Sequence, residues 1–108
     1  MTGDEINRQI AEACGWTDFV THLEFGLMGV EPGTHGLRTE VPWYSCNLNA
    51  MYQAEKALKG YEQIIAYVWH LENRIDWSTD ERMMATHATA RQRAEAFLRA
   101  LGKWKEKP

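Results

Sequence analysis

The sequence predicts an α+β domain, a three-layer α-β-α sandwich in which three helices cover both faces of a small, mainly antiparallel sheet. Two observations support this expectation. Three segments place apolar residues at helical spacing between residues that can cap a helix. Residues 63–71 form an apolar run rich in β-branched and aromatic side chains, which is typical of a strand that is buried on both faces. Such a strand needs cover on two sides, and the helices can supply it.

The clearest amphipathic helix is predicted over residues 44–58, where apolar residues and small alanines recur at heptad-like spacing. Ser45 or Asn47 can cap its start, because either side chain accepts a hydrogen bond from an amide of the first turn. Gly60 can supply the left-handed residue beyond its end. The rest of the fold is expected to be organised around this helix.

Two further helices are predicted at the ends of the domain. The first begins at Thr2, which can form a capping box with Glu5, and ends at Gly15. The last begins at Thr89, which has a glutamine at the matching position, and ends at Gly102. Each presents one apolar stripe for burial.

The strands are less evenly marked. Residues 19–25 alternate in the period-2 manner of a strand, and residues 82–87 give a short strand expected to pair antiparallel with residues 63–71. Between the first of these and the central helix, four glycines and a proline predict that residues 26–38 form a long, turn-rich connection able to pair locally as a hairpin. A connection of this length is more often functional than idle.

Length and charge indicate one domain over residues 1–102 and a basic tail over residues 103–108. Residues 1–90 carry 6 basic and 13 acidic side chains, net −7, whereas residues 91–108 carry 6 basic and 2 acidic side chains, net +4. No apolar run approaches the ~18 residues of a membrane span, and the acidic start lacks the basic region of a signal peptide. A cytoplasmic protein is therefore expected, with no membrane association.

Catalytic and metal-binding motifs are missing from the sequence. The four histidines have no i, i+4 pairing with each other or with cysteine, and Cys14 and Cys46 are interpreted as reduced thiols. The carboxylates between residues 72 and 81 lack the ligand order and glycine of an EF-hand loop, so a solvated acidic turn is the better interpretation. We therefore expect no enzymatic activity, no cofactor and no metal.

Three segments together resemble one known family. They are residues 10–16 (IAEACGW), residues 41–50 (VPWYSCNLNA) and residues 90–101 (ARQRAEAFLRAL). In order and spacing they are similar to the phage ABA sandwich domain family, small phage-associated proteins of unknown function. The resemblance implies an α-β-α sandwich encoded by a bacteriophage or prophage, and therefore a protein located in the cytoplasm of the bacterial host. It supplies no catalytic residues.

The leading functional hypothesis is a phage or prophage accessory protein that acts as a non-catalytic binding module for a host or phage protein. Its contact surface would be the residue 26–38 connection or an exposed sheet edge. Because short sheets leave edges that are commonly paired across a two-fold axis, a homodimer is also expected.

Two alternatives stay open. The tryptophan-rich composition and the glycine-containing connection favour a small-molecule or nucleotide binder that sequesters a host signal. The basic last helix and tail favour weak nucleic-acid binding, although the acidic body opposes it and makes nucleic acid an unlikely partner. The candidate binding surface takes residues from the connection and two tryptophans in polar stretches: Gly29, Glu31, His35, Arg38, Trp77 and Trp104.

Overall fold

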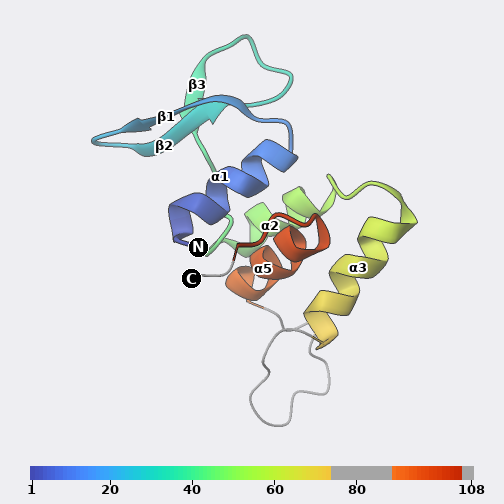
Figure 1. The fold of residues 1–108 in the computed structure, drawn as a ribbon. Coiled ribbons are helices and arrows are strands. Elements are labelled where there is room, and N and C mark those ends of the chain that lie inside the picture. The colour runs from blue at the N-terminus through green and yellow to red at the C-terminus, as the bar shows by residue number, and fades with distance from the viewer. Residues whose placement is uncertain (74–88, 106–108) are drawn as a thin grey trace.

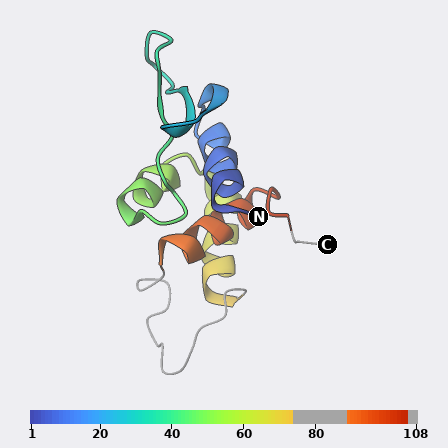
Figure 2. The same ribbon diagram turned by 90° about the vertical axis from the view of Figure 1, so that its left-hand side faces the viewer.

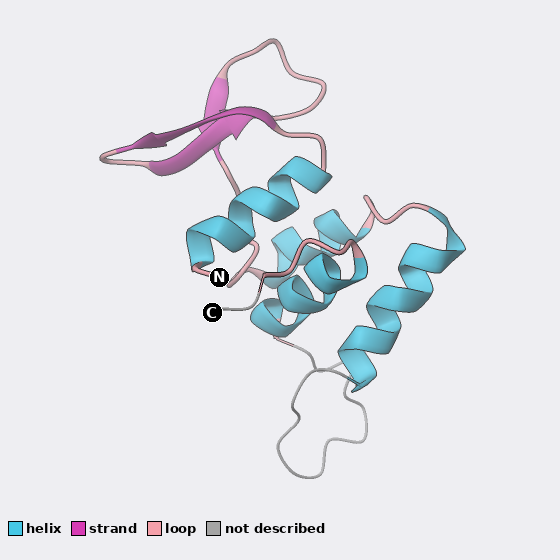
Figure 3. Ribbon diagram, in the orientation of Figure 1, coloured by secondary structure: helices cyan, strands magenta, loops and turns pink. Residues whose placement is uncertain are grey.

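A computed structural model describes residues 1–73 and 89–105. The elements follow in the order α1 (Gly3–Ala13), β1 (Thr17–His22), β2 (Gly26–Val30), β3 (Arg38–Glu40), α2 (Leu48–Glu55), α3 (Gly60–Asn73) and α5 (Ala90–Ala100). The predicted α+β class is confirmed, because the described residues hold four helices and one antiparallel sheet of three strands (Figures 1 and 3). None of these helices has the length and apolarity required to cross a bilayer.

Helix α5 lies at the centre of the helical part and contacts α1, α2 and α3 (Figure 1). Its Ala94, Ala96, Phe97 and Leu98 are all fully buried. The helix starts where the sequence predicts, since Thr89 and its partner three residues on exchange both bonds of a capping box. Small alanines beside one large phenylalanine let three helices approach the same axis closely. The last helix of the chain is thus its core element.

The predicted ends of α1 are also confirmed. Thr2 and Glu5 form the capping box, and Gly15 follows the helix with a left-handed φ of +98°. The buried residues Ile6 and Ile10 lie one turn apart on its inner face. Helix α1 can therefore cover α5 on one side while its far end leads into the sheet (Figure 2).

Helix α2 is shorter than predicted, and Asn47 is the residue that caps it, accepting the amide of Ala50 at 3.1 Å. Ser45 instead donates its own amide to the Asn7 side chain of α1 at 2.9 Å. Gly60 has the left-handed φ expected of it, +75°, but it opens α3 and does not directly follow α2, which ends at Glu55.

A partly buried polar network joins α2, α3 and α5. Arg93 places its Nη1 atom 3.0 Å from Oε2 of Glu55, and the Tyr67 hydroxyl donates to the same oxygen. The Arg93 side chain is only 10% exposed, so its charge depends on this carboxylate. The Arg93 guanidinium also lies 5.2 Å from the centroid of the Tyr52 ring. Glu55 of α2, Tyr67 of α3 and Arg93 of α5 therefore link the three helices to one another.

The sheet has the order β1-β2-β3 with antiparallel pairing throughout. The expected strand around residues 19–25 is present as β1, although it ends at His22. The predicted connection over residues 26–38 is correct only in part: Gly26 begins β2, which forms a hairpin with β1, and residues 31–37 remain irregular. Asp18 has a left-handed φ of +57° at an irregularity in the pairing, and Arg38 of β3 reaches it with an ion pair of 3.0 Å.

The strand predicted at residues 63–71 is wrong, because this segment is the middle of helix α3. A run that is apolar on both alternating faces is also apolar all round a helix, so periodicity alone cannot separate the two. Tyr67 and Leu71 are buried on the side that faces α5, and the Tyr67 ring meets Phe97 edge-on. The strand predicted at residues 82–87 lies outside the described residues.

The three-layer sandwich with three helices is not confirmed. The described residues hold four helices, and the sheet lies at the α1 side of the helical cluster (Figures 1 and 2). Most residues of its strands are exposed or half-buried, and Gly29 is the one buried position in β1 to β3. Without residues 63–71 as a central strand, the sheet is too small to separate two helical layers.

The polar network predicts unequal roles for two glutamates that each bind an arginine. Replacing Glu55 by alanine removes the carboxylate that Arg93 and Tyr67 share in a partly buried position, and it should lower the free energy of unfolding by about 2–3 kcal/mol. Glu12→Ala is the matched control, because Glu12 binds Arg8 at a similar 3.1 Å on an exposed helix surface, where such pairs contribute at most about 0.5 kcal/mol. Urea unfolding of both variants measures the difference, and equal losses would contradict this role for Glu55.

Alkaline pH should weaken the same network. Burial, followed by the hydrogen bond to Glu55, raises the pKa of Tyr67 well above its ordinary value. Above pH ~10 the Tyr67 hydroxyl keeps its proton in the folded chain and loses it in the unfolded chain. The contribution of Tyr67 to the free energy of unfolding is therefore complete below pH ~10 and falls as the pH rises beyond it. Tyr67→Phe removes this titration and should flatten the fall between pH 9 and 11.5, whereas Tyr61→Phe on the exposed side of α3 should not. Parallel profiles for all three proteins would refute the assignment.

Candidate functional site

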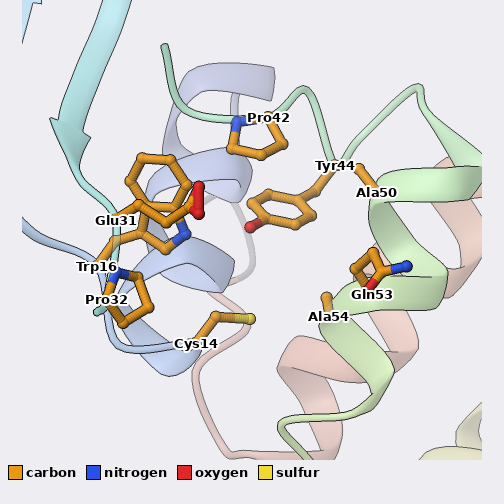
Figure 4. A pocket seen from close by; sticks show the side chains of 9 residues that line it. All are labelled: Cys14, Trp16, Glu31, Pro32, Pro42, Tyr44, Ala50, Gln53 and Ala54. Carbon is orange, nitrogen blue, oxygen red and sulfur yellow. The ribbon is translucent and has the colours of Figure 1, made fainter. Parts of the chain in front are cut away.

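A hollow of about 310 Å³ lies between the sheet end of α1 and helix α2 (Figure 4). One wall comes from the α1–β1 junction and the residues after β2, and the opposite wall comes from α2 and the segment before it. The lining residues are Cys14, Trp16, Glu31, Pro32, Pro42, Tyr44, Ala50, Gln53 and Ala54. Its volume is at the lower end of the range of small-molecule sites.

Two aromatic side chains form the fixed part of the hollow. Trp16 is 7% exposed and Tyr44 is 4% exposed, and both belong to the main hydrophobic core. Trp16 is held in place by its amide, which donates to the carbonyl of Ala11 at 2.9 Å and so closes the end of α1. Burial raises the pKa of Tyr44 strongly. Its hydroxyl is neutral at physiological pH and is hydrogen-bonded with the side chains of Trp16 and Cys14.

Cys14 contributes a half-buried thiol to the hollow. Burial raises the pKa of this thiol, and a hydrogen bond with Tyr44 opposes part of that shift. A nucleophilic cysteine needs the opposite shift, because the thiolate is the reactive form. The arrangement therefore favours binding over thiol chemistry.

Glu31 is the only charged side chain among the described residues that line the hollow. Figure 4 shows its carboxylate beside Trp16, pointing into the space in front of Tyr44. The Glu31 charge is also one of the influences that raise the pKa of Tyr44. In the described part of the chain no ion pair engages this carboxylate, so its charge is available to a ligand.

A second candidate surface is the outer face of α3, which we call the α3 face. It consists of Tyr61, Ile64, Ile65, Val68 and Trp69. These side chains are 39–78% exposed and surround a shallow hollow of about 370 Å³. The Trp69 ring also contacts His70 edge-on, yet it remains 48% exposed. Their spacing of i, i+3, i+4, i+7 and i+8 is the helical signal that could have revealed this face in the sequence.

The predicted binding residues do not come together as one surface. Glu31 lies at the hollow, whereas Gly29 is an internal packing position, because an added Cβ would lie 2.9 Å from the Phe19 ring. Arg38 is engaged by Asp18, and His35 is exposed in the irregular segment between β2 and β3. The predicted residue Trp77 lies outside the described residues.

Trp104 is half-buried against the core and does not form an open stacking platform. The Arg91 and Arg99 guanidinium groups lie 5.7 and 5.4 Å from its ring centroid. Arg99 further binds Glu95 at 2.8 Å, and Arg93 is committed to the polar network. Much of the positive charge of the last helix is therefore used inside the fold.

Within residues 1–73 and 89–105, no three histidine, cysteine or carboxylate side chains come together in a way that could hold a metal ion. The acidic turn predicted between residues 72 and 81 lies almost entirely outside the described residues.

Comparison of the chain with protein-family models, with curated proteins and with solved structures finds no match. The resemblance to the phage ABA sandwich domain family therefore stays a prediction that rests on the three sequence segments alone.

The two cysteines should differ sharply in reactivity. Cys46 is exposed, whereas Cys14 is half-buried with a raised pKa. At pH 8, Ellman's reagent should modify Cys46 at least about tenfold faster than Cys14, because it attacks the accessible thiolate. Cys46→Ser should leave only the slow phase and Cys14→Ser only the fast one. A fast phase that survives in Cys46→Ser would show that the thiol in the hollow is activated after all.

Proposed function

We propose that this chain is a non-catalytic protein-binding module, a phage or prophage accessory protein that acts through contacts with other protein chains. The observation that carries the proposal is the α3 face, an apolar helix surface that stays exposed to solvent. Apolar patches of this kind on small domains mark interaction sites. The partner that this face fits best is a second copy of the same chain.

The pattern of the α3 face is self-complementary. Ile65 lies at its centre, with Tyr61 four residues before and Trp69 four residues after, so an aromatic side chain ends the stripe in both directions. A two-fold axis near Ile65 therefore pairs two antiparallel helices with aliphatic side chains in the middle and Tyr61 opposite Trp69 of the second copy.

Charge favours the same arrangement. The α3 face itself contains no charged side chain, and the nearest carboxylate on the helix, Glu62, lies three residues before Ile65. In an antiparallel pair the two Glu62 positions are about 9 Å apart along the axis, whereas a parallel pair would place them together. Opposed helix dipoles are also favourable.

The area indicates a weak dimer. Side chains of these sizes and exposures offer on the order of 500 Å² per copy. The pair then buries about 1,000 Å², the lower limit for a specific interface. We therefore expect a dissociation constant on the order of 10–100 µM, which allows the dimer to exchange with monomer and with other partners.

The other hypotheses have less support. A nucleotide would bring phosphate charge to a hollow whose charged side chain is the carboxylate Glu31, which repels it. Nucleic-acid binding has less support because Arg93 and Arg99 of the last helix already pair with carboxylates of the chain. The phage setting continues to rest on the sequence resemblance, and the cytoplasmic location on the sequence, which has no apolar run of membrane-spanning length.

Sedimentation equilibrium between 10 and 500 µM tests the dimer. The wild-type chain should pass from the 12.5 kDa monomer towards twice that mass, and Ile65→Glu should stay monomeric because it buries two carboxylates at the two-fold axis. Leu23→Glu is the matched control, since it introduces the same charge at a fully exposed leucine on the hairpin turn. A wild-type monomer at 500 µM, or equal effects of the two variants, would overturn the proposed interface.

A further inference from the structure

The hollow between α1 and α2 has properties that protein binding through α3 does not use. We infer that it is a binding site for a small organic cation, that is, a protonated amine or quaternary ammonium group that carries apolar substituents. Three features of its wall favour such a ligand: a carboxylate, two fixed aromatic rings and an otherwise uncharged lining.

The carboxylate sets the sign of the ligand charge. Glu31 is held near the hollow by the turn that follows it, in which the Thr34 amide and hydroxyl both donate to the Glu31 carbonyl, at 3.3 and 2.7 Å. The side chain stays free to point inward (Figure 4). With no basic residue among the described lining residues, the local charge is negative and favours a cation.

The aromatic rings select a soft, weakly hydrated cation over a metal ion. Trp16 and Tyr44 both line the hollow, and the core fixes their rings so that only 7% and 4% of the two residues stays exposed (Figure 4). Aromatic faces attract ammonium groups, most strongly when water is displaced. A hard metal ion would instead need several oxygen ligands, and Glu31 is the only carboxylate among the described lining residues.

The remaining lining sets the size and polarity of the ligand. Pro32, Pro42, Ala50 and Ala54 add apolar surface, and Gln53 offers an amide that can bond a hydroxyl or a carbonyl group. A compact ligand with an ammonium group, a few methyl groups and one polar atom therefore suits the hollow better than a flat, anionic nucleotide.

Choline and its uncharged isostere 3,3-dimethyl-1-butanol separate this inference from simple apolar binding. Titrating each into ¹⁵N-labelled protein at constant ionic strength should shift the amide signals around residues 14–16, 31–34 and 53–54. We expect choline to saturate with a dissociation constant on the order of 1–10 mM, and the isostere to bind at least about fivefold more weakly because it lacks the charge.

Two variants complete the test. Glu31→Gln keeps the shape of the wall and should weaken choline binding about fivefold or more while leaving the isostere unchanged. Glu24→Gln is the control, because Glu24 is an exposed carboxylate on the hairpin turn and does not line the hollow. Equal binding of choline and its isostere, no effect of Glu31→Gln, or no saturable shift up to 50 mM would each overturn the inference. Repeating the titration on monomeric Ile65→Glu keeps this result separate from that of the α3 face.

Discussion

The fold depends on the burial of one cation. Arg93 lies on α5, which contacts the other three described helices. Its guanidinium group is nearly removed from water. A buried charge is tolerated only when a partner and further hydrogen bonds accompany it, and here α2 supplies Glu55 while α3 supplies Tyr67. The polar network favours the arrangement that brings all three groups within bonding distance.

Local rules predicted the helix ends well. The capping boxes at Thr2 and Thr89 and the left-handed Gly15 depend on residues within three positions of each other, so sequence alone determines them. The sequence left two candidate caps for α2. Asn47 caps the helix, and the amide of Ser45 is bonded by Asn7 of α1, a contact that no local pattern contains.

Tertiary context decided what the sequence left ambiguous. Residues 63–71 have high strand propensity, but they form a helix whose inner side meets Phe97 and Glu55. The same ambiguity hid the α3 face, since its residues were divided between two faces of a supposed strand. Of the residues that line the hollow, only Glu31 was predicted from the sequence as a binding residue. Its other walls come from segments up to forty positions apart along the chain, and one sequence contains no signal that brings Trp16, Tyr44 and Gln53 together.

The position of the hollow also affects how cooperatively the molecule unfolds. Strands β1 to β3 contact chiefly one another, and they join the helical cluster through α1 and the segment that leads to α2. A subdomain attached in this way can unfold locally while the α5 core stays intact. Because Trp16 and Glu31 belong to the sheet side and Tyr44 and Gln53 to the helical side, anything that occupies the space between them ties the two cooperative units together. Occupancy would then appear as slower amide exchange throughout the sheet, far from the atoms that the occupant touches.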